Sequence, residues 1–171
     1  TVRAAAAAGV AIVPVGGHTG LTGATEAEGA LMISLERMNR IRQIRPEARV
    51  AVVEAGVVLS RLHDAAAAHD LVFPLTFGAR GSAMIGGCLA TNAGGSNVLR
   101  YGSTRGLCLG LEAVLARSDP TDVARHLTQV QGVRRLTLPN EMGEAFKVLA
   151  LGRGLDQPLI GFAFQDLRGR L

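Results

Sequence analysis

The sequence predicts an α+β fold whose C-terminal part is organised in the α/β manner. A helix-like stretch, an apolar run and a glycine-rich loop open the chain, and β-rich stretches follow at 41–44 and 50–54. After residue 118, helix-like and strand-like stretches alternate. Strands grouped in one part and alternating elements in another are typical of such a mixed fold. We therefore expect two parts, residues 1–116 and residues 117–171, with a boundary near 116–120.

The first elements follow from local composition. Residues 2–8 are rich in alanine, the best helix former, and Gly9 suits the left-handed turn that ends a helix. The apolar runs Val10–Val13 and Leu31–Leu35 predict strands. The stretches 41–44 and 50–54 predict a hairpin, because Pro46 between them suits a turn. We expect residues 31–54 to pair in antiparallel fashion.

The later elements are predicted from periodicity and capping signals. Between residues 57 and 69 the apolar positions recur at helical spacing, which predicts an amphipathic helix. Asp119 followed by Pro120 is typical of a helix start. The remaining expected elements are a strand at Leu109–Leu115, a helix from Asp119 to about Val130, a strand at Val133–Leu138, a helix from Asn140 through Leu151 and a strand at Leu159–Phe164.

Composition narrows the function classes. Apolar residues make up 48% of the 171 residues and charged residues 19%, so the chain can bury a core and is expected to be globular. The formal net charge of +4 favours an anionic ligand, yet it is diffuse. Aromatic residues reach only 4%, which argues against nucleic-acid binding through base stacking. No run attains the roughly 18 apolar residues of a membrane span.

Cysteine and histidine give no sign of a metal site. Cys88 and Cys108 lack the paired spacing of zinc ligands, and His63, His69 and His126 show no ligand spacing either. We expect the histidines at the surface and the cysteines as buried thiols, with a disulfide as the alternative. Thiols indicate a reducing compartment. The expected location is the cytoplasm, with the periphery of the inner membrane as the alternative.

The segment Pro14–Ala24 (PVGGHTGLTGA) is a glycine-dense loop directly after an apolar run. Glycines let backbone N–H groups approach an anion, and Thr19 and Thr22 add hydroxyl groups, so the loop suits a phosphate. Its glycine spacing fits neither the G-x-G-x-x-G fingerprint nor a Walker loop. Taken alone, such a turn is more often structural than functional.

A second glycine-rich segment runs from Gly81 to Gly95 (GSAMIGGCLATNAGG). Gly86 and Gly87 would let the backbone approach a ring or a phosphate, and Ser82, Thr91 and Asn92 offer hydrogen-bonding groups. The alternative interpretation is a tightly packed crossing of a helix and a loop. Two such segments predict a dinucleotide that is held by both.

The order of motifs resembles a known family. Pro-x-Gly-Gly-x-Thr-Gly-Leu, Glu54-Ala-Gly56, Pro74-Leu, Gly-Ser-x-x-Ile-Gly-Gly, Ala-Thr-Asn-Ala-Gly-Gly, Arg100-Tyr-Gly and Gly-Leu-Glu112 follow one another. They resemble the PCMH-type FAD-binding domain of the FAD-linked oxidases, which include vanillyl-alcohol oxidase, and most of all the glycolate oxidase and D-lactate dehydrogenase branch. The resemblance covers residues 2–116 and implies a small α/β lobe beside a lobe of mixed or antiparallel sheet.

The resemblance also implies a cofactor and a site. The cofactor would be FAD, with its pyrophosphate wrapped by the N–H groups of residues 15–21. The residues implied to bind it are Val15, Gly16, Gly17, His18, Thr19, Gly20, Leu21, Pro74, Gly78, Gly81, Ser82, Ile85, Gly86, Gly87, Ala90, Thr91, Asn92, Ala93, Gly94 and Gly95. The implied reaction is hydride transfer from a 2-hydroxy acid such as D-lactate or glycolate to the flavin, with a quinone, a cytochrome or oxygen as electron acceptor. Catalytic residues stay unassigned.

Individual side chains leave alternatives open. His18 stands where the berberine-bridge branch of the superfamily carries a histidine bonded covalently to flavin, and the alternative is a loop histidine that hydrogen-bonds near the phosphates. Arg100 and Arg105 follow the second glycine-rich segment, where a cation could meet a carboxylate substrate or a flavin phosphate, or else be solvated.

The resemblance fails beyond the first part. Residues 118–171 do not match the family, and neither its late Gly-Thr-Leu-Gly motif nor its substrate domain is found, so a cap domain or a partner subunit is expected to be missing. Three hypotheses stand: the FAD half of a 2-hydroxy acid oxidoreductase, a truncated or fused chain that binds flavin weakly or not at all and has no turnover, and an NADPH-dependent reductase of an enolpyruvyl sugar on the same fold.

Overall fold

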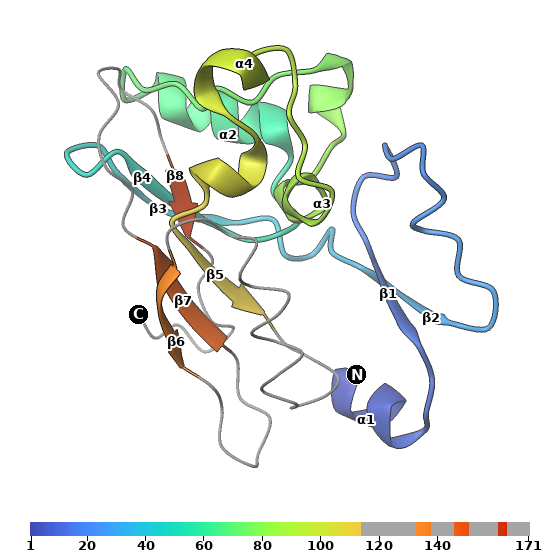
Figure 1. Ribbon diagram of the computed structural model, residues 1–171. Coiled ribbons are helices and arrows are strands. Elements are labelled where there is room, and N and C mark those ends of the chain that lie inside the picture. Colours follow the sequence, from blue (N-terminus) through green and yellow to red (C-terminus); the bar gives the residue numbers. More distant parts are fainter. Residues whose placement is uncertain (114–132, 138–145, 151–160, 164–171) are drawn as a thin grey trace.

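The computed structural model describes residues 1–113, 133–137, 146–150 and 161–163. Within these residues, helices and three sheets are present, with most helices grouped between β4 and β5, in agreement with the predicted α+β class (Figure 1). The elements are α1 (Val2–Ala7), β1 (Ile12–Val15), β2 (Leu31–Ser34), β3 (Ile41–Arg45), β4 (Val50–Val53), α2 (Leu59–Ala67), the 3-10 helix η1 (Gly78–Gly81), α3 (Ile85–Ala90), α4 (Val98–Tyr101), the 3-10 helix η2 (Thr104–Leu107), β5 (Gly110–Ala113), β6 (Val133–Thr137), β7 (Phe146–Ala150) and β8 (Gly161–Ala163).

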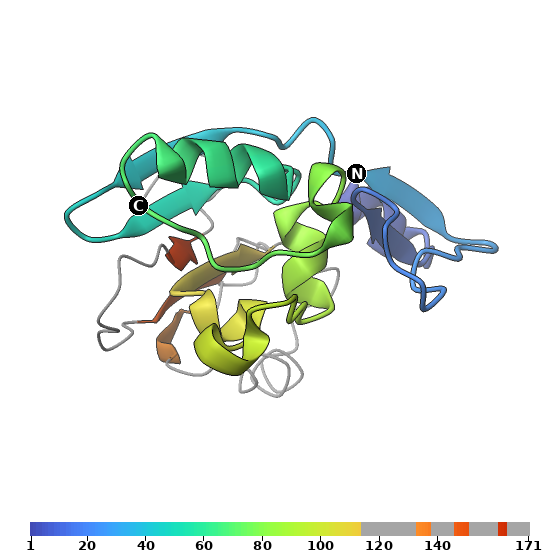
Figure 2. The same ribbon diagram turned by 90° about the horizontal axis from the view of Figure 1, so that it is seen from above.

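Strands β1 and β2 form a two-stranded parallel sheet with Ile12 opposite Leu31 and Val15 opposite Ser34. The predicted antiparallel pairing of residues 31–35 is therefore wrong. The connection 16–30 is long enough for the crossover that parallel neighbours require, whereas a hairpin needs only a tight turn. We call α1, β1, β2 and the connection 16–30 the arm; it lies to one side of the other helices in both views (Figure 2).

The predicted hairpin and amphipathic helix are confirmed. Strands β3 and β4 pair in antiparallel fashion, and the N–H of Arg49 donates to the carbonyl of Pro46 in the turn between them. Helix α2 buries Leu59, Leu62 and Ala66, which share one of its faces.

The C-terminal part differs from the expectation. Residues 146–150 form strand β7, so the predicted helix from Asn140 through Leu151 is wrong there. The sheet order β5-β7-β6 is antiparallel throughout, unlike the predicted α/β organisation. Phe146 and Val148 favour a strand once neighbours offer hydrogen bonds, which outweighs a weak local helix preference.

Two predicted strands are confirmed at β6 and, in shorter form, at β8, which lies parallel to β4. The predicted helix from Asp119 to Val130 falls outside the described residues. The boundary near residue 116 remains a prediction.

The hydrophobic core joins β4, α2, residues 71–75, α3 and η2, and it includes no residue of the arm among the described residues. Its largest fully buried side chains include Phe73, Leu59, Leu62, Leu75 and Ile85. The second glycine-rich segment is therefore built on the core, while the first is part of the arm.

Candidate functional site

The two glycine-rich segments lie against each other, backbone to backbone. A Cβ atom on Gly17 would overlap the carbonyl oxygen of Ser82, and one on Gly16 would lie 3.3 Å from the Cβ of Met84. Figure 1 shows the connection after β1 beside α3. Glycine at position 17 is thus required by close packing, and the arm is held at the start of α3.

The first loop carries unpaired backbone donors. The N–H groups of residues 16–22 donate to no other residue in the part of the chain that the structure describes. Gly16, Gly17 and Thr19 are half-buried at this place, whereas Leu21 is fully exposed. Partly shielded N–H groups without partners are suited to an anion, and the loop follows the buried last residue of β1, Val15.

His18 lies in this loop with its side chain exposed. Its φ of 52° is in the left-handed region, which a non-glycine residue seldom adopts. The chain therefore bends at His18, in the middle of the run of residues whose N–H groups have no partner among the described residues.

The beginning of the second segment is anchored to the core. The N–H of Ile85 donates to the carbonyl of Val57 at 2.9 Å, and that of Gly86 donates to the carbonyl of Ala55 at 2.8 Å. A Cβ on Gly86 would lie 2.8 Å from the Cβ of Ala55. The Ile85 side chain is fully buried, so of these two predicted site residues neither offers a side chain to a ligand.

Other glycines predicted to bind the cofactor are not required by close packing. No described atom lies within 4 Å of a Cβ placed on Gly78, Gly81 or Gly87, and the same holds for Gly20 in the first loop. Ser82, between these glycines in sequence, is exposed. These positions are where the backbone is open to a ligand.

The end of α3 uses its polar groups within the protein. The hydroxyl of Thr91 donates to the carbonyl of Gly87 at 2.9 Å, and the Oδ1 atom of Asn92 accepts the N–H of Arg105 at 3.1 Å. Ala90 is exposed and Ala93 half-buried. The hydroxyl of Thr91, which was predicted to contact the cofactor, therefore donates its hydrogen bond within α3.

Arg105 caps this helix. Its Nε atom donates to the carbonyl of Leu89 at 3.1 Å and its Nη2 atom to that of Ala90 at 2.9 Å. A cation is favourable at the C-terminal end of a helix. These contacts give Arg105 a structural function, while Arg100 lies 5.2 Å from the centre of the Tyr101 ring.

The last predicted glycines pack closely. Gly95 has a φ of 65°, and a Cβ there would overlap the carbonyl oxygen of Thr76. A Cβ on Gly94 would lie 3.0 Å from the Cγ2 atom of Val98. Both therefore hold the loop before α4 in place.

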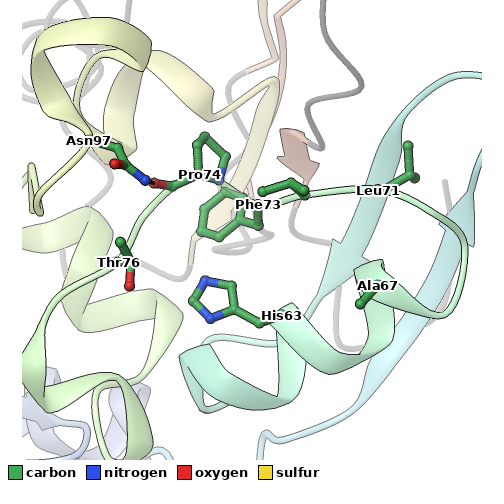
Figure 3. A pocket seen from close by; sticks show the side chains of 8 residues that line it. His63, Ala67, Leu71, Phe73, Pro74, Thr76 and Asn97 are labelled. Atoms are coloured by element: carbon green, nitrogen blue, oxygen red, sulfur yellow. Dashed lines mark hydrogen bonds between the residues drawn. The ribbon is translucent and has the colours of Figure 1, made fainter.

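A pocket of about 290 Å³ lies between α2, the segment 71–76 and the start of α4 (Figure 3). Of the residues predicted to bind the cofactor, only Pro74 lines it. Its lining consists of His63, Ala67, Leu71, Val72, Phe73, Pro74, Thr76 and Asn97. His63 and Asn97 were not predicted, because their contacts are to backbone carbonyls far away in sequence.

His63 is half-buried, so its predicted surface position is confirmed only in part. Its Nε2 atom lies 2.8 Å from the carbonyl oxygen of Leu75, and its ring centre lies 6.3 Å from that of Phe73. His69 is exposed as predicted, and His126 lies outside the described residues.

Glu54 is a buried carboxylate that precedes the turn at Ala55 and is held by two arginines. Its side chain is only 4% exposed; it accepts the N–H of Arg40 at 2.8 Å and the Nε and Nη2 atoms of Arg42 at 3.0 and 2.5 Å. Burial alone would raise the pKa of Glu54, but the N–H of Arg40 and the guanidinium of Arg42 outweigh it and hold that pKa below its ordinary value. An ionised Glu54 thus tethers β3 to the turn that anchors α3.

Cys88 and Cys108 are buried free thiols, as predicted. Burial raises the pKa of each to about 11, so neither is a ready nucleophile. Within the described ranges, no group of three or more histidine, cysteine or acidic side chains could hold a metal ion. Nor does any described helix combine the length and the apolar character that crossing a membrane requires.

The sequence is similar to those of two D-2-hydroxyglutarate dehydrogenases. D-2-hydroxyglutarate dehydrogenase of Xanthomonas citri pv. viticola is 41% identical over 152 residues, which cover 88% of this chain and 30% of that protein. The mitochondrial D-2-hydroxyglutarate dehydrogenase of Bos taurus is 44% identical over 108 residues, or 63% of this chain and 20% of that protein. The chain thus spans less than a third of the length of these relatives.

The fold is shared with a solved structure of alkyldihydroxyacetonephosphate synthase. The TM-score is 0.64 at 18% sequence identity, over 87% of this chain and 30% of that one. The family model described as the FAD binding domain matches residues 1–123, which include both glycine-rich segments. The chain therefore belongs to the FAD binding domain family of the FAD-linked oxidases, and its cofactor is FAD.

Proposed function

We propose that this chain is the FAD-binding part of a flavin-dependent oxidoreductase that oxidises a 2-hydroxy acid. The unpaired N–H groups of residues 16–22 carry the proposal, because the loop begins, at Gly16 and Gly17, directly against the second glycine-rich segment. A pyrophosphate needs several donors at a place where no side chain intrudes.

The predicted binding residues fall into those that would contact FAD and those that support them from the core side. Residues 15–21 hold the pyrophosphate through main-chain N–H groups, and the open positions Gly78, Gly81 and Gly87, with exposed Ser82, line the rest of the cofactor. The buried Ile85 and the closely packed Gly86, Gly94 and Gly95 support this surface from behind.

The names of the two relatives favour one 2-hydroxy acid as the substrate. Both relatives described above are D-2-hydroxyglutarate dehydrogenases, which supports D-2-hydroxyglutarate over D-lactate or glycolate. Bound FAD supplies the oxidant: the carbinol C–H leaves as a hydride to the flavin and the hydroxyl proton is released, which gives a 2-oxo acid. The electron acceptor, whether a quinone, a cytochrome or oxygen, remains a prediction.

A second candidate is a chain that holds flavin but has no turnover. The share of the relatives that the chain spans, 30% and 20%, favours it for this polypeptide. A part that binds the cofactor need not contain the groups that bind the substrate.

The test begins with the visible absorbance spectrum of the purified protein and its melting temperature with and without added FAD. We expect flavin absorbance and a rise in melting temperature. Anaerobic D-2-hydroxyglutarate then separates the candidates: loss of the visible flavin absorbance supports the oxidoreductase, and bound but unreduced flavin supports the second candidate. The absence of any flavin signal and of any melting shift would refute FAD binding.

A protease gives an independent check on where FAD lies. Glu26 and Glu28 are exposed in the connection that contains the first loop. Cleavage after these residues by a glutamate-specific protease should slow when FAD is present, because FAD orders the connection. Cleavage after exposed Glu47, in the β3–β4 turn, should not change and serves as the control.

The covalent bond between His18 and flavin remains a hypothesis. Its exposed side chain in the first loop is free to reach a bound cofactor. Acid precipitation of the flavin-loaded protein tests it: yellow colour in the pellet supports the bond, and flavin entirely in the supernatant supports the alternative of a hydrogen-bonding histidine.

A further inference from the structure

The extended segment Phe73–Thr76 is held by side chains and by backbone from two distant parts of the chain. Three successive carbonyl groups each accept a hydrogen bond from outside the segment. Pro74 accepts from the Nδ2 atom of Asn97 at 3.0 Å, and Thr76 accepts from the N–H of Ser96 at 2.8 Å and its hydroxyl at 3.3 Å. The carbonyl of Leu75, between them, lies 2.8 Å from the Nε2 atom of His63.

The contact with Leu75 indicates which ring nitrogen of His63 carries a hydrogen. A carbonyl oxygen can only accept, so the Nε2 atom of His63 carries a hydrogen and donates it. Figure 3 shows the His63 ring on α2 beside the segment, and Asn97 joined to Pro74 from the opposite side. The segment is thus clamped between α2 and the residue that precedes α4.

This clamp leads directly to the open glycines. Thr76 is followed by Phe77 and then by η1, which contains Gly78 and Gly81. Phe73 and Leu75 are 2% and 1% exposed, so their side chains are fixed in the core, while the carbonyls of residues 74–76 are fixed by the clamp. A displacement of Leu75 would therefore move the backbone that faces the cofactor.

From this we infer that His63 and Asn97 are positioning residues for the cofactor: they hold the carbonyls of Leu75 and Pro74 and thereby set the place of η1. The inference rests on the proposed function, since η1 is assigned there to the FAD surface. Neither side chain need touch FAD, because the pocket that they line contains only Pro74 of the predicted cofactor residues.

The test compares histidine substitutions at two positions of one region. His63→Leu removes the donor and keeps much of the volume, whereas His63→Gln retains an N–H donor. His69→Leu is the matched control, because His69 is exposed just beyond the end of α2. We expect the FAD dissociation constant to rise at least fivefold in His63→Leu, to recover in His63→Gln and to stay unchanged in His69→Leu. Wild-type affinity in a folded His63→Leu protein would overturn the inference.

Asn97→Ala provides a second arm if His63→Leu does not fold. Asn97 is exposed, so the fold should survive its truncation. We expect a rise of threefold or more in the FAD dissociation constant, and an unchanged constant would overturn the inference.

Hydrogen exchange of the protein without FAD separates this inference from the proposed function. Amides of residues 77–84 should exchange at least fivefold faster in His63→Leu and in Asn97→Ala than in the wild type, while those of β3 and β4 should not. If the wild type binds no FAD but this acceleration is seen, the proposed function fails and the clamp stands. Unchanged exchange in both variants would refute the clamp.

Discussion

Both glycine-rich segments contain packed and open glycines, but they differ in what their backbone N–H groups contact. In the first loop, the N–H groups of residues 16–22 have no partner among the described residues. In the second, the N–H groups of Ile85 and Gly86 are bound to the turn before α2, and the Ile85 side chain lies in the core. The contrast teaches that glycine content alone does not mark a ligand site; what surrounds each missing Cβ decides it.

The same contrast separates the arm from the core. Leu31 and Met32 of β2 are 39% and 48% exposed, whereas Ala51 and Val53 of β4 are fully buried. Regions with few buried apolar contacts open at lower free energy than the core. Binding of FAD at the first loop would therefore be coupled to ordering of the arm, while the second segment stays in place.

The largest loss of stability is expected from Glu54→Ala, because Glu54 directly follows β4 of the core. The substitution leaves Arg42, whose side chain is only 18% exposed, without its carboxylate. Removal of one partner of a largely buried ion pair costs about 3 kcal/mol of the free energy of unfolding. Urea denaturation measures it. Arg40→Ala is the control, since the Arg40 side chain is 75% exposed and should cost less than about 1 kcal/mol. Equal losses in both variants would contradict the account.

Gly17→Ala tests the contact between the two regions. The added Cβ would overlap the Ser82 carbonyl, so the arm must shift away from α3. We expect a loss of about 2 kcal/mol, as for other overpacked sites, together with weaker FAD binding. Thermal denaturation and an FAD titration check both. A variant with wild-type stability would show that the two segments are not in close contact.

Gly20→Ala makes the same chemical change where no described atom lies within 4 Å of the new Cβ. We expect the melting temperature without FAD to stay within about 1 °C of the wild type, because no contact is disturbed. The FAD dissociation constant should rise about tenfold, equivalent to about 1.4 kcal/mol. A fall in stability without any loss of affinity would reverse the assignment of open and packed glycines.

The smallest expected effect is a change in how the free energy of unfolding depends on acidic pH in Glu54→Gln. The pKa of Glu54 is lowered in the folded state, so its stabilising contribution is complete above its unfolded-state pKa of about 4.3 and is lost as the pH falls toward the lower folded value. Over that acidic range the free energy of unfolding should fall less steeply with decreasing pH in Glu54→Gln than in the wild type. Urea denaturation in buffers of decreasing pH measures the slopes. Parallel slopes would mean that Glu54 has an ordinary pKa when folded.

Local patterns were enough to predict the parts that local forces decide. The apolar face of α2 and the turn at Pro46 indicated a helix and a hairpin that the structure confirms. The motifs around Gly17 and Gly86 located both glycine-rich segments and indicated FAD, in agreement with the family.

Pairing between distant segments could not be predicted in the same way. Strand β2 lies beside β1 in parallel, and residues 146–150 join β5 and β6, because of hydrogen bonds that only the folded chain offers. The carbonyl contacts of His63 and Asn97 are of the same kind. Neither residue has a spacing that would indicate a partner at residues 74–75.

In the proposed function, the first loop binds the pyrophosphate of FAD. Calorimetric titration of the flavin-free protein with FAD and with riboflavin, which has the same ring but no phosphate, tests it most directly. We predict that FAD binds and that riboflavin binds at least a hundredfold more weakly, a difference of about 2.7 kcal/mol. Equal affinities for the two compounds, or no binding of FAD, would contradict the claim.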